Sequence, residues 1–199
     1  MPLLYACSSN PGKLLEFTFT AQRSLAGGFQ IQALPGLAQI PPPPEDGATY
    51  RENAAAKALY YSGFTNELVF ADDSGLEVDA LGGAPGIHSA RFGGPQANGE
   101  RNNAVLLEKL SGVRERRARF VTAISLARQG SLLETSVGAA EGEILHEPRG
   151  TLGFGDDALF LFSALGKTFA ELGDAEKFAV GARGQAFRRL LDWLVKAPA

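Results

Sequence analysis

The sequence contains few of the residues on which several kinds of functional site depend. It has one cysteine, Cys7, so no disulfide can form within the chain, and a reducing, cytoplasmic setting is the simpler interpretation. Its two histidines, His88 and His146, stand far apart and in no metal-ligand spacing, which disfavours a zinc site. No G-x-S-x-G motif occurs, so a serine hydrolase is poorly supported.

Long hydrophobic runs and a strong net charge are also missing. We find no signal peptide, no lipidation motif and no apolar span near 20 residues, so we expect a cytoplasmic protein that does not bind membranes. The net charge of −3 gives no general attraction to nucleic acid. The basic run "VRERRARF", 113–120, is more typical of a solvated strand edge than of a nucleic-acid site.

The 199 residues suit one domain, or one domain with two lobes around a cleft. Short apolar runs at 3–7 and 158–162 predict buried strands, and 67–71 predicts a strand before the two aspartates. Residues 29–33 are a candidate for a further strand, and 117–127 with 131–141 predicts a hairpin joined at "RQG". The patterns predict helices at 11–25, 49–62, 98–112 and 184–196, with a short helix after Asp174. Because strands and helices mix throughout, we expect an α/β fold with a mixed sheet.

The stretch "ACSSNPGKLLEF", 6–17, has the features of an anion site at a helix start. Asn10 is a good N-cap and Pro11 is favoured at the first helical position, which leaves Ser8, Ser9 and free backbone N–H groups facing outward. Lys13 falls at the third helical position, where its charge opposes the helix dipole unless an anion binds. The alternative is an ordinary helix start with a solvated lysine.

The segment "GDAEKF", 173–178, repeats this pattern. If Asp174 caps a helix, Lys177 again lies at the third helical position. Two basic groups at two helix starts would suit a polyphosphate, and the alternative is a surface lysine beside Glu176.

Carboxylates supply a second requirement of a triphosphate site, because Mg2+ takes a few carboxylates together with water and phosphate oxygens. Glu45, Asp72 and Asp73 lie on or beside predicted loops. Neighbouring side chains on a strand point to opposite faces, so Asp72 and Asp73 should do different jobs. Either one could instead be a turn former that binds nearby N–H groups.

Five segments, in order, resemble the motifs of the inosine triphosphate pyrophosphatase family, which hydrolyses nonstandard purine nucleoside triphosphates. The longest and most specific is "ADDSGLEVDALGGAPGIHSARFGG", 71–94. The others are "SSNPGKLLE", "GATYRENAAAKA", "GTLGFGDDALF" and "KTFAELGDAEKFAVGARGQA". The resemblance extends from residue 3 to residue 190.

The resemblance implies two α/β lobes with a long mixed sheet flanked by helices, a cleft between the lobes, and a homodimer. It implies a Mg2+-dependent enzyme that hydrolyses ITP, dITP or XTP to the monophosphate and pyrophosphate, and so removes altered nucleotides from the pool. The whole chain, 1–199, is then a single domain of this family.

The resemblance also implies roles for individual residues. Asp73 and Lys13 would be catalytic, with Asp73 as the base for the attacking water, and Glu45 and Asp73 would bind the metal. Phe154 would stack on the purine, and Lys177 and Arg183 would close over the nucleotide and read its base. The remaining residues expected to bind substrate are Ser8, Ser9, Asn10, Pro11, Gly12, Ser74, Gly155, Asp156, Asp157 and Ala182.

Two segments depart from the family pattern. Asp156 stands where the family has a tyrosine and Ala158 where it has a proline, and Ala182 stands where it has a histidine and Gly181 where it has a serine. If that histidine hydrogen-bonds the purine, its loss costs about 1–3 kcal/mol of binding. The same chemistry with a shifted or relaxed base preference is therefore an alternative. A nucleotide-binding sensor without hydrolysis is a further one, which the intact Lys13, Glu45 and Asp73 oppose.

Overall fold

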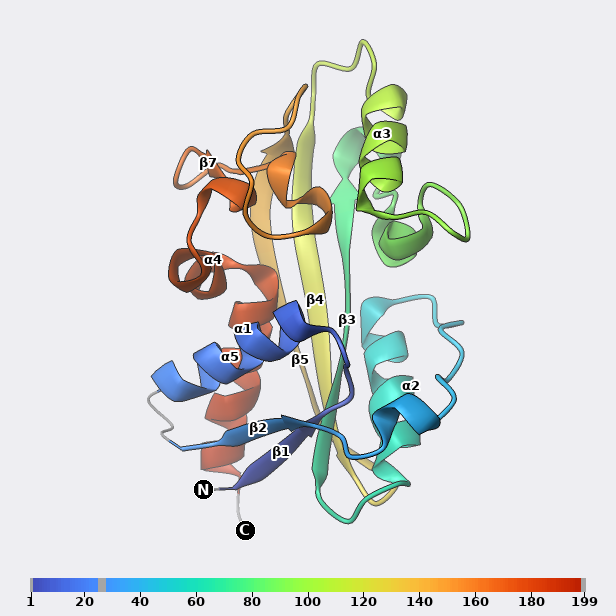
Figure 1. Cartoon of the computed structure of the whole chain (residues 1–199), viewed down its shortest axis with the longest axis vertical. Helices are drawn as coiled ribbons and strands as arrows, with labels where there is room; N and C mark the ends of the chain where they lie inside the picture. The colour runs from blue at the N-terminus through green and yellow to red at the C-terminus, as the bar shows by residue number, and fades with distance from the viewer. Residues whose placement is uncertain (1, 25–27, 198–199) are drawn as a thin grey trace. The chain divides into compact units, whose positions relative to one another are not determined.

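The structure, a computed structural model, describes residues 2–24 and 28–197 and has a mixed sheet with helices against it (Figure 1). The strand order is β2-β1-β3-β4-β5-β6-β7; β1 is parallel to β2 and β3, whereas β6 is antiparallel to β5 and β7. The strands are β1 Leu3–Ala6, β2 Gln30–Ala33, β3 Leu68–Val78, β4 Arg117–Arg128, β5 Ser131–Ile144, β6 Phe160–Phe162 and β7 Lys167–Thr168. The helices are α1 Pro11–Arg23, α2 Tyr50–Ser62, α3 Gly99–Lys109, α4 Asp174–Val180 and α5 Ala182–Lys196. The predicted fold class is confirmed.

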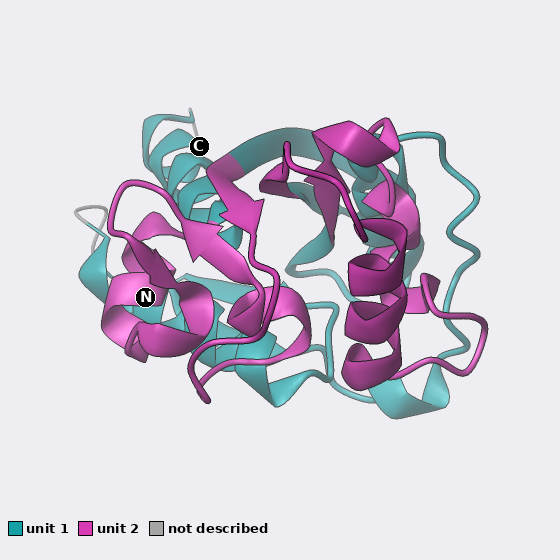
Figure 2. Cartoon of the chain, turned by 90° about the horizontal axis from the view of Figure 1, so that it is seen from above, with its two compact units in different colours: residues 1–73, 122–138, 182–199 teal, residues 74–121, 139–181 magenta. Residues whose placement is uncertain are grey.

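The chain divides into two compact units, coloured separately in Figure 2. Unit 1 comprises Met1–Asp73, Thr122–Gly138 and Ala182–Ala199, and unit 2 comprises Ser74–Val121 and Ala139–Gly181. Strands β3, β4 and β5 each contribute residues to both units. The boundary in β3 falls directly after Asp73, so the two neighbouring aspartates belong to unit 1.

Strand alternation organises the core of unit 1. Phe70 packs against α1 and α5, where the rings of Phe17 and Phe187 each lie 4.9 Å from its ring centroid. Its neighbours Val69 and Ala71 belong to a separate cluster that includes residues of α2. Successive side chains of β3 therefore point to opposite faces of the sheet and pack against different helices, as expected for a strand.

Strand β3 is longer than the sequence predicted. The apolar run ends at Ala71, but the strand continues to Val78, so Asp72 and Asp73 lie within it. Acidic residues are unfavourable in strands and at buried positions unless they are paired. Lys13 neutralises Asp72 and Lys57 neutralises Asp73, and these ion pairs allow the strand to continue.

Phenylalanine rings fill much of the core of unit 2. Phe160 and Phe169 are buried, and their ring centroids are 4.9 Å apart. Phe120 of β4 lies 4.6 Å from Phe160, and Phe162 lies 5.7 Å from Phe169. These offset and tilted pairs anchor β6 beside the segment that leads to α4.

The helix starts follow the predicted caps with one exception. Asn10 accepts a hydrogen bond from the backbone N–H of Lys13, and Thr49 accepts one from that of Glu52. For α4, however, Gly173 is the N-cap and Asp174 is the first helical residue. The Gly173 carbonyl accepts from the N–H of Lys177 at 3.0 Å, which moves Lys177 from the predicted third position to the fourth.

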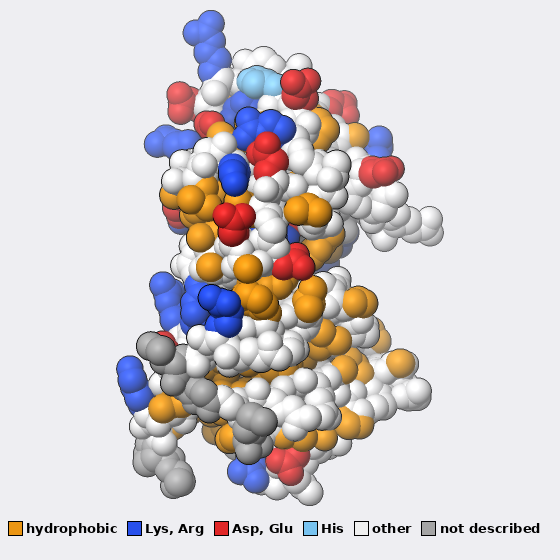
Figure 3. Space-filling view, turned by 60° about the vertical axis from the view of Figure 1, so that its left-hand side comes forward, with side chains coloured by type: hydrophobic (Ala, Val, Ile, Leu, Met, Phe, Trp, Pro, Cys, Tyr) orange, Lys and Arg blue, Asp and Glu red, His pale blue; other side chains and the backbone are white. Residues whose placement is uncertain are grey.

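Hydrophobic side chains also reach the surface, as Figure 3 shows among the charged and polar ones on one face. The large exposed ones include Phe64, Leu132 and Phe154. None of the described helices combines the length and apolar character needed to cross a membrane.

Candidate active site

The first cluster of charges forms around Asp72, on the side of β3 that meets α1 and α5. Its carboxylate lies 2.9 Å from the Nζ of Lys13 and 3.3 Å from the Nε of Arg183. Arg183 also donates through Nη1 to Glu16 at 2.8 Å. The side chain of Asp72 is only 3% exposed, so the two cations compensate a carboxylate that water cannot reach.

The electrostatics of this cluster keep Asp72 ionised. Burial alone raises the pKa of a carboxyl group, but the charges of Lys13 and Arg183 outweigh burial and hold the pKa of Asp72 well below its ordinary value. The same partners, Asp72 and Glu16, raise the pKa of Arg183 against the opposite effect of its own burial. Asp72 therefore acts as a fixed negative charge that orients two cations.

The second cluster forms around Asp73, on the opposite face. Its Oδ1 lies 3.1 Å from the Nζ of Lys57, and its Oδ2 accepts from the side-chain amide of Asn53 at 3.1 Å. The same Lys57 ammonium lies 3.1 Å from Oε1 of Glu45. Asn53 and Lys57 are four residues apart on α2, so both reach Asp73 from one face of that helix.

This second cluster has the donor chemistry of a site for a hard divalent cation. Two carboxylates, from Glu45 and Asp73, converge on one positive charge, and carboxylate oxygens are ligands that Mg2+ accepts. In the described part of the chain, no three Asp, Glu, His or Cys side chains form a cluster suited to hold a metal alone. A metal bound here would therefore need further oxygen ligands, such as phosphate and water.

Burial raises the pKa of Asp73 although Lys57 and Asn53 lower it in part. The pKa of Lys57 is raised as well: its burial lowers it, but the neighbouring Asp73, Asp72 and Glu45 charges outweigh that effect. The pKa of Asp72 is thus lowered and that of Asp73 raised, in line with the different partners that these neighbouring strand residues contact.

The predicted anion-binding loop lies in unit 1 between β1 and α1. Asn10 caps the helix, and its own N–H donates to the hydroxyl of Ser8 at 3.2 Å. Ser9 and Pro11 are exposed, and Gly12 is partly exposed in the first turn. Lys13 extends from this turn to Asp72, so the structure brings the loop and the first charge cluster together.

In unit 2 the predicted base-binding residues gather around the loop 153–157. Asp157 accepts from the backbone N–H of Phe154 at 2.7 Å and pairs with Lys177 of α4. The Nζ of Lys177 lies 4.8 Å from the ring centroid of Phe154, within the range of a cation–π contact. Lys177 is buried, which contradicts the alternative of a surface lysine beside Glu176.

Asp156, which replaces the tyrosine of the family pattern, lies in the same loop. Burial and the adjacent charge of Asp157 raise the pKa of Asp156 to about 6. Gly155, which lies between Phe154 and Asp156, has a φ of 61°, a conformation that glycine adopts without strain.

Three predicted substrate-binding residues remain. Ser74 directly follows Asp73 in β3 and is the first residue of unit 2. Ala182 and Arg183 begin α5 in unit 1, where Ala182 is buried and Arg183 pairs with Asp72 and Glu16. The base-reading role expected for Arg183 stays a prediction; the observed contacts of Arg183 connect it to the Asp72 cluster.

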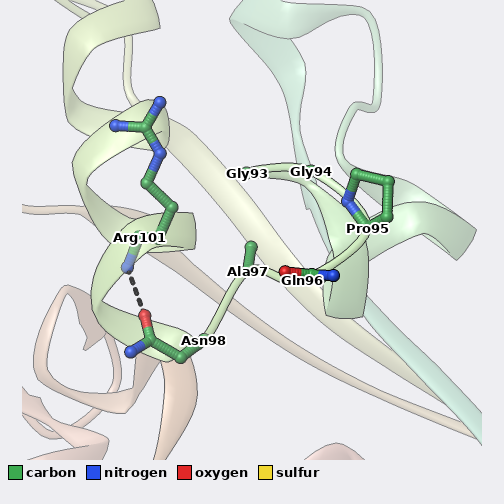
Figure 4. A pocket seen from close by; sticks show the side chains of 7 residues that line it. All are labelled: Gly93, Gly94, Pro95, Gln96, Ala97, Asn98 and Arg101. Atoms are coloured by element: carbon green, nitrogen blue, oxygen red, sulfur yellow. Dashed lines mark hydrogen bonds between the residues drawn. The ribbon is translucent and has the colours of Figure 1, made fainter.

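A cavity of about 580 Å³ lies elsewhere in unit 2, beside the start of α3 (Figure 4). In Figure 4 the side chain of Asn98 points to the backbone N–H of Arg101, to which it is hydrogen-bonded at 2.9 Å. The lining residues are Gly93, Gly94, Pro95, Gln96, Ala97, Asn98 and Arg101. None of them is among the substrate-binding, catalytic or metal-binding residues predicted from the sequence.

Three residues of the charge clusters had no assigned role at the level of sequence: Glu16, Asn53 and Lys57. Asn53 and Lys57 carried a usable signal, because their spacing of four places them on one face of a helix. Glu16 occurs three residues after Lys13, which likewise puts both on one side of α1. What the sequence could not show was their partners, which are Asp73 of β3 for Asn53 and Lys57 and Arg183 of α5 for Glu16.

Comparison with known proteins gives one consistent picture. The sequence pattern of the Ham1 family matches residues 4–193. A protein of Exiguobacterium sp. named dITP/XTP pyrophosphatase is 46% identical over 187 residues, which cover 94% of each chain. One of the same name from Acidobacterium capsulatum is 45% identical, over 94% of this chain and 96% of its own. The solved structure of a HAM1 protein from Coxiella burnetii superposes with a TM-score of 0.87 at 34% identity, and covers 99% of this chain and 100% of its own.

Proposed function

Because the chain belongs to the Ham1 family, we propose that it hydrolyses nonstandard purine nucleoside triphosphates, ITP, dITP and XTP, to the monophosphate and pyrophosphate. The observation that carries this proposal is the 46% identity, over 94% of both chains, to a relative named dITP/XTP pyrophosphatase. The names of the relatives favour this reaction over the alternatives of a shifted base preference and a sensor without hydrolysis.

The residues of the Asp73 cluster support a metal-dependent reaction. Glu45 and Asp73 would hold Mg2+, and the two carboxylates that now share Lys57 supply the oxygen donors. A bound Mg2+ would neutralise phosphate charge and make a bound water more acidic.

The chain's own groups would carry out positioning and proton transfer. Lys13 and the N–H groups of the first turn of α1 would bind phosphate oxygens, as a helix N-terminus does. Asp73 would accept the proton of the attacking water. Each of its oxygens makes one hydrogen bond, to Lys57 or Asn53, and a carboxylate oxygen has a second lone pair that can accept a proton.

The loop 153–157 would bind the base. The ring of Phe154 is 48% exposed although it lies next to the Lys177 ammonium, so it keeps a large area available for stacking on a purine. Lys177 and the carboxylates of Asp156 and Asp157 offer polar groups beside that ring. Hydrogen bonds to such groups would distinguish one purine from another.

We also propose that the chain is a single cytoplasmic domain that functions as a homodimer and binds neither nucleic acid nor membranes. The support is the family resemblance together with the small net charge of −3.

A nucleotide panel with pyrophosphate detection tests the proposal. We expect pyrophosphate from ITP, dITP and XTP with Mg2+, less from GTP and dTTP, and almost none after chelation of the metal. Equal rates for GTP and ITP would contradict the base preference, and full activity after chelation would contradict the role of the metal.

A further inference from the structure

The loop 153–157 is fixed by two anchors that lie far apart in the sequence. The first is Asp157, which binds the Phe154 N–H within the loop and is held by Lys177 of α4. The second is Asn103 of α3, whose side-chain Nδ2 donates to the carbonyl oxygen of Gly155 at 3.0 Å. Gly155 has no side chain, so its backbone carbonyl is the group through which α3 can hold it.

Helix α3 also packs very closely against this loop. A Cβ atom placed on Gly99, the first residue of α3, would lie 3.3 Å from the Cα of Gly155. A Cβ atom at position 99 would therefore fit only if one of the two backbones shifted by a few tenths of an ångström. Glycine at this position keeps the start of α3 within reach of Gly155.

The residue before Asn103 fixes a different loop, so the two asparagines have separate tasks. Asn102 accepts from the N–H of Gly93 at 2.7 Å and donates to the carbonyls of Ser89 and Ala90 at 3.2 and 3.3 Å. Consecutive helical residues point about 100° apart. One turn of α3 therefore ties the 89–93 segment through Asn102 and the Phe154 loop through Asn103.

We propose that Asn103 is a positioning residue for nucleotide binding, because its hydrogen bond to Gly155 holds the neighbouring Phe154 ring ready to stack on the base. This inference rests on the proposed function, in which Phe154 stacks on the purine. When the hydrogen bond is lost, Asp157 still closes the loop, so the loop keeps its fold but loses one of its anchors. Part of the binding free energy of the nucleotide must then be used to order the Phe154 loop, which the hydrogen bond of Asn103 otherwise orders before binding.

The chemistry of the Asn103 side chain allows a clean test. Its Oδ1 is buried and accepts no hydrogen bond from any residue that the structure describes. Asn103→Leu has nearly the same shape, so it removes the donor to Gly155 and leaves no buried acceptor behind. Ala104→Leu is the matched control, since it adds a leucine at the exposed next position of the same helix.

The experiment measures KM and kcat for ITP in the wild type, Asn103→Leu and Ala104→Leu, with thermal unfolding of each. Loss of one hydrogen bond predicts that KM rises about threefold to tenfold in Asn103→Leu, with kcat within about twofold of the wild type. Ala104→Leu should match the wild type in both. If Asn103→Leu does not fold, Asn103→Ala replaces it with the same expectation.

Three results would overturn the inference. The first is an unchanged KM in a folded Asn103 variant, and the second is a fall in kcat with KM unchanged. The third is an equal rise in KM in Ala104→Leu. Failure of the proposed function gives a different pattern, because the wild type itself would then release no pyrophosphate from ITP.

Discussion

Asp72 and Asp73 are adjacent in the chain and share almost no partners. Asp72 binds Lys13 and Arg183, whereas Asp73 binds Asn53 and Lys57. Burial raises the pKa of both carboxyl groups, but the charges of Lys13 and Arg183 outweigh it only at Asp72, so the pKa of Asp72 is lowered and that of Asp73 is raised. At the scale of the residue, these contacts fit a structural and orienting role for Asp72, and the chemical role of Asp73 is our proposal.

Asp73→Asn tests the chemical role. The amide has the shape of the carboxyl group but can neither accept the proton of water nor bind a metal as an anion. We expect turnover of ITP to fall at least about 100-fold, a typical loss when a general base is removed. Steady-state pyrophosphate release measures the effect, with thermal unfolding as the check on folding. Turnover within tenfold of the wild type would exclude Asp73 as the base.

Asp72→Asn tests the structural role through the free energy of unfolding. Removing this buried charge leaves Lys13 and Arg183 without their shared carboxylate, which should cost about 3 kcal/mol at neutral pH. Denaturant titrations of the variant and the wild type at several pH values measure the difference.

The pH dependence of that difference has a definite sign. The folded pKa of Asp72 lies below its unfolded value of about 3.9, so its contribution to stability is fully present above about pH 5. This contribution to stability is lost only as the pH falls from about 5 toward the folded pKa of Asp72. We expect a constant difference between pH 6 and 8 that narrows below about pH 4. A difference that widened with acid would contradict this assignment.

At the scale of the element, the start of α5 depends on a glycine in β5. A Cβ atom on Gly138 would overlap the carbonyl oxygen of Ala182 and lie 2.6 Å from the backbone nitrogen of Ala186. The strand and the helix therefore touch backbone to backbone at the turn that carries Arg183. This contact places the guanidinium group within reach of Asp72 and Glu16.

Gly138→Ala should consequently destabilise the protein by about 1–3 kcal/mol, the usual cost of overpacking. Gly63→Ala is the matched control in the same unit, because its Cβ would meet only the carbonyl oxygen of Tyr60 at 3.4 Å and its φ of −73° suits alanine. Chemical denaturation of both variants measures the difference. Equal free energies of unfolding for the two variants would show that α5 can move away from β5 without destabilising the protein.

Much of this arrangement was predictable because its signals are local. The caps at Asn10 and Thr49 follow from residues within one helical turn, and "RQG" predicted the turn between β4 and β5. Alternation in a strand was enough to separate Asp72 from Asp73. The length of β3 and the position of Arg183 were not predictable in this way. They depend on ion pairs between residues that lie far apart in the sequence. Asp72 pairs with Lys13, which is 59 positions away, and with Arg183, which is 111 positions away.

At the scale of the whole molecule, the predicted residues are distributed over both units. Unit 1 holds the anion-binding loop and both charge clusters, and unit 2 holds Phe154, Asp157 and Lys177. The residues expected to contact the base therefore come from both units, since Arg183 belongs to unit 1 and Phe154 and Lys177 belong to unit 2.

The proposed homodimer has a direct test in solution. Light scattering on a sizing column should give a mass about twice the 21.0 kDa of one chain. A mass of one chain at the concentrations used for activity would show that the monomer is the active form.

The position of bond cleavage tests the central claim most directly. Phosphorus NMR of ITP during turnover, with the purified protein and Mg2+, distinguishes the two ways to hydrolyse a triphosphate. Cleavage between the α- and β-phosphates gives IMP and pyrophosphate, which is the result we predict, and Asp73→Asn should leave the ITP signals unchanged. The appearance of IDP and orthophosphate would contradict the proposed reaction.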